Sequence, residues 1–233
     1  MHDAKMRMSR RRAGGAPKAL IALSLAMRDE LLQSSSGLPP VHVKYNSLEV
    51  DPGLGTHHGA AKTGYIWVGR LEAEKGFDLV VRTWRSWENP PPLTIVGDGK
   101  LADQARELSL ASPHVEWTPR MEHQQVMTAI AEHRVSLITP LWSEPFGRVA
   151  LESLAVGTPV VHTGKGALDE LVGASGWKLD LRGDLRAQLS DFYEQAQATT
   201  GRARARYEGV LSPSATTKVL QSIYRTALEP GVH

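Results

Sequence analysis

The sequence contains no cysteine, so disulfide bonds and cysteine-ligated metal centres are excluded. It also lacks a strong excess of one charge. Its 27 basic and 25 acidic residues leave a net charge of +2, too small to indicate nucleic-acid binding by itself. No stretch approaches the roughly 20 apolar residues that a transmembrane helix needs. The motifs of serine hydrolases, zinc proteases and P-loop proteins are absent as well. These absences suit a protein of the reducing cytoplasm.

A basic run at the N-terminus precedes a short apolar stretch at 19–26. The arrangement resembles a signal peptide superficially, but charged residues follow at once and no clear cleavage site is present. We interpret the run as a solvated tail that can also contact anionic lipid at the inner face of a membrane. Its basic residues are Lys5, Arg7, Arg10, Arg11, Arg12 and Lys18.

From residue 63 onward, short apolar segments alternate with helical patterns, which predicts a parallel sheet covered on both faces. The expected strands are 65–68, 93–96, 115–117, 135–139, 159–162 and 177–179. The expected helices are 77–87, 101–110, 124–132, 148–156, 168–172, 185–198 and 216–228. Right-handed crossovers make this a doubly wound, Rossmann-like α/β domain. Its ligand is expected beyond the carboxyl ends of the strands, at a topological switch point.

The N-terminal part contains only one further α/β unit. A strand at 19–23 is followed by a helix at 25–34, capped by Ser24 and with Met27, Leu31 and Leu32 facing inward, and then by a strand at 41–45. Such a unit cannot bury a core alone, so it is expected to expose an apolar edge and face. We therefore predict three parts: an N-terminal remnant at 1–46, a Gly-rich polar linker at 47–62, and the α/β domain at 63–230.

The segment 143–152 is the most informative part of the chain, because it places Glu144 and Glu152 eight positions apart. It follows a predicted buried strand and contains a Pro-Phe-Gly turn and the start of a helix. Free backbone N–H groups and the helix dipole favour a phosphate at such a place. The two carboxylates can accept hydrogen bonds from hydroxyl groups, and together these features suggest a sugar nucleotide. The alternative is that Glu144 only complements the helix dipole and that Glu152 is solvated.

The loop 69–76 follows the first strand of the α/β domain and carries two cations, Arg70 and Lys75. Gly69 lets the backbone approach a ligand, and a guanidinium fork beside an ammonium group suits a diphosphate. Two such cations could replace a metal ion as an electrostatic clamp. The alternative is a surface loop whose charges pair with Glu72 and Glu74.

Two glycine-rich turns also end predicted strands. The segment 97–102 fits the dinucleotide pattern Gly-x-Gly-x-x-Ala only weakly, because it follows the second strand of the domain. NAD binding is therefore disfavoured, and Gly97 is expected to allow a tight turn and close backbone contact with a ligand. The segment 164–170 holds two further glycines, and Glu170 there either contacts the ligand or caps the chain locally.

Taken together, these segments resemble the retaining family 4, or "group 1", glycosyltransferases of the GT-B fold. The resemblance is carried by EPFGRVALESLAVGTPVV with its Glu-x7-Glu spacing, and by VGRLEAEKG, LTIVGDG, VEWTPRM and GALDELVG in family order. The segments ALIALSLAMRDELL and Tyr45–Glu49 are similar to the end of the N-terminal domain of such an enzyme. The chain therefore looks like a C-terminal donor-binding domain behind a truncated N-terminal domain.

The resemblance implies transfer of a sugar from a nucleotide-diphosphate donor with retention of configuration, without a metal or other cofactor. It implies catalytic roles for Arg70 and Lys75, on the diphosphate, and for Glu144, against the donor sugar. Glu152 would bind the ribose. The backbone of the first α/β loops and of the turn before the Glu152 helix would complete the site. The implied residues are Gly69, Gly97, Arg120, Met121, Phe146, Gly147, Arg148 and Val149, with Arg120 and Met121 at the base.

The sequence departs from the family pattern in three places. Pro119 stands where a glycine is usual, which puts the base contacts in doubt. The linker reads Asn-Ser-Leu-Glu instead of Asn-Gly-x-Asp. Only about 45 residues precede it, so the acceptor face is missing. We therefore keep two hypotheses: a donor-binding half with transferase activity, or a non-catalytic module that forms a homo- or hetero-oligomer through its N-terminal remnant. An NAD-dependent oxidoreductase is a third option without an identified catalytic pair.

Overall fold

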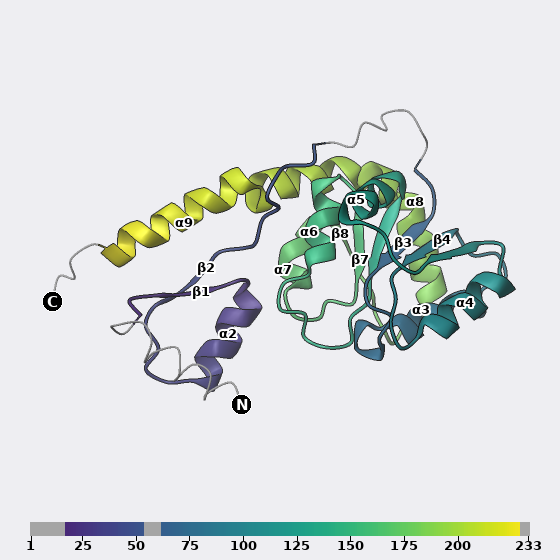
Figure 1. Ribbon diagram of the computed structural model, residues 1–233, viewed down its shortest axis with the longest axis horizontal. Coiled ribbons are helices and arrows are strands. Elements are labelled where there is room, and N and C mark those ends of the chain that lie inside the picture. Colours follow the sequence, from purple (N-terminus) through teal and green to yellow (C-terminus); the bar gives the residue numbers. More distant parts are fainter. Residues whose placement is uncertain (1–16, 54–61, 229–233) are drawn as a thin grey trace.

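The structure, a computed structural model, describes residues 17–53 and 62–228. Its main body is a parallel sheet of six strands in the order β5-β4-β3-β6-β7-β8, with helices on both faces (Figure 1). The strands are β3 (Tyr65–Val68), β4 (Leu93–Val96), β5 (Val115–Thr118), β6 (Val135–Ile138), β7 (Val160–His162) and β8 (Gly176–Lys178). The doubly wound, Rossmann-like fold predicted from the sequence is thereby confirmed.

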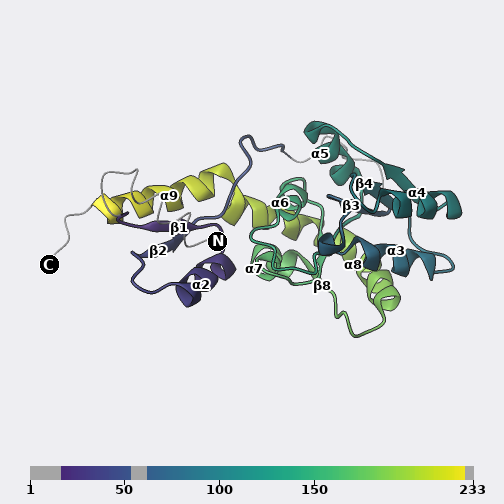
Figure 2. The same ribbon diagram turned by 60° about the horizontal axis from the view of Figure 1, so that its bottom comes forward.

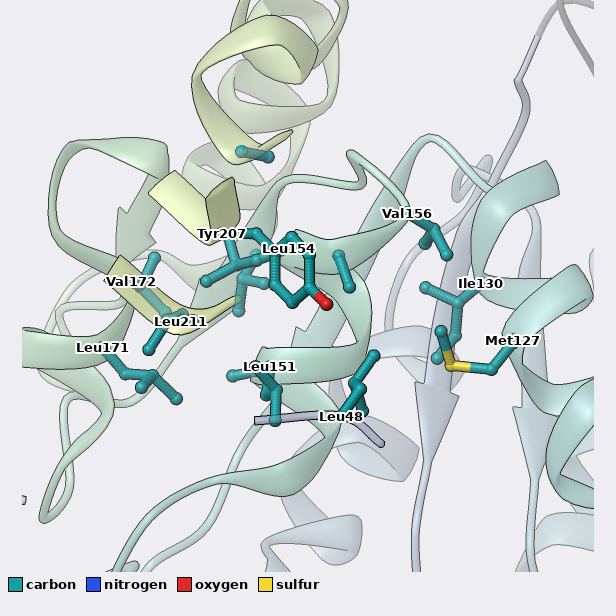
Figure 3. Packing of buried hydrophobic residues seen from close by; sticks show 14 of the residues in the cluster. Leu48, Met127, Ile130, Leu151, Leu154, Val156, Leu171, Val172, Tyr207 and Leu211 are labelled. Carbon is teal, nitrogen blue, oxygen red and sulfur yellow. The ribbon is translucent and has the colours of Figure 1, made fainter. Parts of the chain in front are cut away.

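The helices divide between the two faces and bury two apolar clusters. The first cluster involves α5, α6, α7 and the turn η3, and Figure 3 shows part of it, with Leu151 and Leu154 of α6 near Ile130 of α5 and Tyr207 of η3. The second involves α3, α4 and α8. The helical elements are η1 (Ala73–Lys75), α3 (Phe77–Arg85), α4 (Ala102–Ala111), α5 (His123–Glu132), α6 (Arg148–Ala155), α7 (Leu168–Val172), η2 (Gly173–Ser175), α8 (Leu185–Arg206), η3 (Tyr207–Leu211) and α9 (Pro213–Leu228).

Helix α8 corrects one prediction, because it continues well past the expected end at 198. The Thr199-Thr200-Gly201 segment has low helix propensity. However, Ala196, Thr199 and Ala203 are buried on one helical face. Tertiary packing therefore carries the helix through a locally unfavourable segment. A π-helical turn, η3, then leads into α9.

The N-terminal unit consists of β1 (Leu20–Ala22), α2 (Leu25–Ser34) and β2 (Val41–Val43), with the two strands paired in parallel. The predicted cap is confirmed, because the Met27 N–H donates to Ser24 Oγ at 3.1 Å. The predicted inward face of α2 is formed only in part: Met27 and Leu31 are half-buried, whereas Leu32 is 52% exposed, and the helix has no fully buried residue. Within the described chain, no second layer covers that side of the helix.

Polar contacts seat the N-terminal unit against the carboxyl-terminal side of the sheet domain. Glu170 accepts hydrogen bonds from the Leu25 and Ala26 N–H groups and from the Tyr45 hydroxyl, each at 2.9 Å. Burial and then the bond to Glu170 raise the pKa of Tyr45 to about 12. Ser24 Oγ donates to the Pro145 carbonyl at 2.8 Å. In Figures 1 and 2 this unit and α9 lie at the same end of the molecule, away from α3 and α4.

The chain after β2 is fixed to the sheet domain at Asp51. The Arg204 guanidinium makes two hydrogen bonds of 2.8 Å to this carboxylate, and they hold the pKa of Asp51 below its usual value. Leu48 is buried in the first cluster nearby. Among the described residues, none of the helices is both long and apolar enough to span a membrane.

Candidate functional site

The candidate site lies at the topological switch point of the sheet, between β3 and β6. Strand β3 is central, with β4 on one side and β6 on the other. The chain therefore leaves these two strands toward opposite halves of the sheet, and ligands of open α/β sheets generally bind beyond the carboxyl ends of such strands. Lys75 follows β3 and Glu144 follows β6, and their Nζ and Oε2 atoms are 2.7 Å apart. The side chains are 24% and 16% exposed, so the pair is partly shielded from solvent.

Arg70 has a different partner from Lys75. Its guanidinium bonds to Glu74 at 2.8 Å, and both side chains are well exposed. This is the loop pairing considered as the alternative to a diphosphate clamp. In the structure each of the two predicted clamp cations is thus held by its own carboxylate. An exposed ion pair of this kind contributes little to stability. Arg70 can therefore leave Glu74 for a more highly charged ligand at a small cost in free energy.

Glu152 is buried, with its side chain only 5% exposed. A buried carboxylate needs partners, and Glu152 Oε1 receives Arg148 Nε at 3.1 Å and lies 3.0 Å from His123 Nε2. The solvated alternative for Glu152 is therefore wrong. The sequence analysis did not identify His123 as a site residue, because 29 positions separate it from Glu152. The only local signal was the position of His123 at the start of the helix after β5.

The start of α6 presents backbone N–H groups beside Glu144. Gly147 precedes the helix, and no side chain of the described residues caps it. Phe146 is buried, whereas Arg148 is exposed and Val149 half-buried. Unpaired N–H groups and the helix dipole make this helix start suited to an anion, provided that other groups converge there.

Two glycines fix the backbone around the site. A Cβ on Gly97, which has φ +147°, would lie 1.8 Å from the Gly69 carbonyl oxygen, so the turns after β3 and β4 pack backbone against backbone. A Cβ on Gly166, with φ +64°, would lie 2.1 Å from the carbonyl oxygen of Glu144. The Ala167 N–H donates to that same oxygen at 2.9 Å. The loop after β7 thus holds the main chain of Glu144 in place.

The remaining predicted residues lie farther along the sheet edge. Arg120 and Met121 follow β5; Arg120 is exposed, and Met121 packs against the first cluster. Glu170, for which two roles were open, caps α2 of the N-terminal unit.

A cavity of about 860 Å³ opens between the linker and helices α5 and α6. Phe146 and Arg148 are the predicted site residues in its wall, and His123 connects it to Glu152. The other lining residues are Asn46, Ser47, Leu48, Glu49, Val50, Pro52, Gln124, Met127, Thr128, Ala131, Leu151 and Val156. The part of the chain that the structure describes contains no cluster of three His, Asp or Glu residues able to hold a metal ion.

Solved structures of similar shape share the fold of this chain. TarM superposes with a TM-score of 0.76 over 98% of this chain and 46% of its own, at 15% identity. HepE of Anabaena, solved in complex with UDP and glucose, gives 0.65 over 99% of this chain and 68% of its own, at 20% identity. At these identities the likeness shows the fold, which is that of the GT-B glycosyltransferases.

Similarity in sequence goes further. A glycogen synthase of Mycobacterium tuberculosis is 32% identical over 203 residues, which is 80% of this chain and 48% of that protein. The 2-deoxystreptamine N-acetyl-D-glucosaminyltransferase of Streptomyces fradiae is 30% identical over 72% of this chain and 41% of its own length. The chain spans about half the length of these relatives. The family model "Glycosyl transferases group 1" matches residues 60–178, and the chain belongs to this family.

Proposed function

We propose that this chain binds a nucleotide-diphosphate sugar and supplies the donor half of a glycosyl transfer that retains the anomeric configuration. The observation that carries the proposal is the Lys75–Glu144 pair at the switch point, beside the start of α6. A cation from the loop after β3 meets a carboxylate and a helix N-terminus that both belong to the segment after β6. A diphosphate attached to a hydroxylated ring would use all three.

Lys75 would leave Glu144 and bind the diphosphate, joined by Arg70 after its release from Glu74. Negative charge grows on the departing diphosphate during the reaction. Cations placed at that group therefore stabilise the transition state more than the ground state. With two cations in these roles, we propose that the transfer needs no metal ion or other cofactor.

The two glutamates would bind hydroxyl groups on two different parts of the donor. Glu144, freed from Lys75, would face the donor sugar, while Glu152 would exchange Arg148 and His123 for the ribose hydroxyls. The backbone from Phe146 to Val149 would bind sugar hydroxyls and phosphate. Gly69 and Gly97 would let the first loops approach the nucleotide, and the main chain at Arg120 and Met121 would meet the base.

The same proposal covers the organisation of the chain. Residues 63–230 would form the donor-binding domain, 47–62 the linker, and 1–46 the remnant of an acceptor-side domain. The parts 1–16, 54–61 and 229–230 of these ranges lie outside the described residues. We propose a cytoplasmic location, where nucleotide sugars are available, with contact to the inner face of a membrane through the basic N-terminal run.

A second candidate is a non-catalytic sugar-nucleotide module that works with a partner chain. It is favoured by the exposed apolar residues of the N-terminal unit, Ile21, Leu25 and Leu32. Such a two-stranded unit is marginal by itself, and further strands or helices would cover it. Turnover of a donor by the isolated chain would favour the enzyme, whereas binding without turnover, with association in size-exclusion chromatography, would favour the module.

The proposal is tested by calorimetric titration of the chain with UDP, GDP and ADP and with their hexose esters. Replacing Lys75 with Ala should weaken the binding of the preferred nucleotide roughly 10- to 100-fold, because a charge-assisted hydrogen bond is lost. Replacing Arg70 with Ala should weaken it less, since Arg70 is more exposed. The matched control is Lys218→Ala on the exposed surface of α9.

Three results would count against this assignment. Absence of binding to every nucleotide would remove the donor-site proposal, and equal affinities of the Lys75→Ala and Lys218→Ala variants would remove the role of Lys75. Metal independence is tested separately, by repeating the titration in excess EDTA. A loss of affinity restored by Mg²⁺ would contradict it.

A further inference from the structure

An exposed tryptophan stands next to the candidate site and has no part in the proposal so far. Trp142 lies between β6 and Glu144 and is 41% exposed, and its neighbour Leu141 is 47% exposed. Both follow the buried Thr139, which is only 2% exposed. A large aromatic side chain left open at the edge of a polar site is a feature of ligand-binding surfaces.

The indole of Trp142 is held beside the switch-point pair. Lys75 Nζ lies 5.0 Å from its ring centroid and 2.7 Å from Glu144 Oε2. The ammonium is thus held by a carboxylate and by the electron-rich face of the ring together. The ring therefore lies beside the two side chains to which the proposed function assigns the diphosphate and the donor sugar.

The backbone around Trp142 is firmly positioned by the loop after β3. The Leu141 N–H donates to the Glu74 carbonyl at 2.9 Å, and Thr139 Oγ1 donates to the Lys75 carbonyl at 3.1 Å. Thr139 Oγ1 in turn accepts from Trp67 Nε1 at 3.0 Å. The chain directly before Trp142 is therefore attached to the loop that carries Lys75, which brings the two residues onto neighbouring segments.

We propose that Trp142 is a specificity-determining residue that stacks against the apolar face of the donor hexose. A pyranose ring presents several C–H groups on one face, and burying them on an indole removes apolar surface from water. The inference rests on the proposed function, because it requires a sugar nucleotide bound at Lys75 and Glu144. It adds that the chain recognises the sugar through a ring face as well as through hydroxyl groups.

The competing explanation is that Trp142 only positions Lys75. The two roles differ in what they do to the free nucleotide. A ring that only holds Lys75 would affect a nucleoside diphosphate and its sugar ester equally, since both carry the diphosphate. A ring that stacks on the hexose contributes to the ester alone. The quantity to measure is therefore the ratio of the two dissociation constants.

The experiment is calorimetric titration with UDP and UDP-glucose, GDP and GDP-mannose, and ADP and ADP-glucose. Replacing Trp142 with Leu should lower the preference for the ester over the free diphosphate roughly fivefold, the size of one ring-stacking contact. Trp142→Phe should keep most of that preference, since it retains a ring. Leu141→Ala is the matched control, because it shortens the neighbouring exposed side chain and leaves the backbone contact to Glu74 in place.

Each outcome decides the matter. A fall in the ratio with Trp142→Leu, and not with Leu141→Ala or Trp142→Phe, supports stacking on the sugar. An equal loss of affinity for diphosphate and ester, or no change in either, overturns it while leaving the proposed function intact. If no nucleotide binds to the unaltered chain, the proposed function fails and this inference fails with it.

Discussion

The N-terminal unit and the sheet domain of this chain are held together by different kinds of interaction. The sheet domain buries two apolar clusters, and its strands contain residues such as Ile66 and Leu93 that are almost fully inaccessible. In the N-terminal unit, α2 has no buried residue. Its fixed points are Glu170 at the start of α2, the Tyr45 hydroxyl, and Ser24 against Pro145.

The contrast teaches that secondary structure and independent stability are separate properties. Both regions form strands and helices, but the large apolar clusters that drive folding lie in the sheet domain. The N-terminal unit adds only a few apolar contacts, through the buried Ala22 and through Leu23 and Tyr45, which pack against the first cluster. Hydrogen bonds between the regions position the unit without replacing a core, since their net contribution is about 1–3 kcal/mol each. The N-terminal unit therefore depends on the sheet domain for its place in the fold.

The largest expected difference comes from the same substitution in two helices of ten residues each, α4 and α2. Leu108 of α4 is 1% exposed and Leu32 of α2 is 52% exposed. Leu108→Ala should lower the free energy of unfolding by about 4 kcal/mol, through lost burial and a residual cavity. Leu32→Ala should change it by less than about 0.5 kcal/mol. Urea denaturation followed by circular dichroism measures both, and comparable losses would contradict the contrast.

A second prediction is that acid destabilises the sheet domain through His162 of β7. Burial lowers the pKa of His162 from 6.5 to about 4, and its Nδ1 accepts the Gly164 N–H at 3.1 Å, which requires an unprotonated nitrogen. Between these two pH values the unfolded chain binds a proton that the folded chain does not. The contribution of neutral His162 to the free energy of unfolding is thus complete above about pH 6.5. As the pH falls toward 4, the free energy of unfolding decreases by up to roughly 3 kcal/mol.

This pH dependence is measured by unfolding the protein in urea at intervals between pH 7 and pH 4. His162→Gln should flatten the decline, while the matched surface variant His114→Gln should keep it. A decline of equal slope in the two variants would show that other groups, among them the buried His133 with its lowered pKa, carry the effect.

The smallest expected effect concerns the attachment of the N-terminal unit. Glu170→Ala removes the acceptor of the Leu25 and Ala26 N–H groups and of the Tyr45 hydroxyl. Amide hydrogen exchange in 20–45 should accelerate, by an amount corresponding to about 2 kcal/mol of local opening. Exchange in β3 and β6 should stay unchanged. The control is Glu30→Ala on the exposed side of α2, and a slowdown or a uniform acceleration across the chain would contradict the prediction.

Much of the sheet domain could be predicted from the sequence, because the alternation of apolar segments with helical patterns shows which residues of each strand and helix are buried. The strands at 65–68 and 93–96 and the helix at 168–172 have the predicted bounds. The end of α8 was not predictable from propensity, since the burial of Thr199 and Ala203 depends on contacts far away in the chain. The exposure of Leu32 on α2 was missed for the same reason, because local spacing does not show whether a covering layer exists.

The sequence by itself also determined which residue types gather at the strand ends, and the family that their order indicates. Only the tertiary structure decided their partners. In the fold, Lys75 forms an ion pair with Glu144, 69 positions away. Glu152 contacts His123 and Arg148. Arg70 forms a hydrogen bond with its near neighbour Glu74. Hydrogen bonds and ion pairs act over a few ångströms, and which side chains come that close is fixed by how the strands are ordered in the sheet.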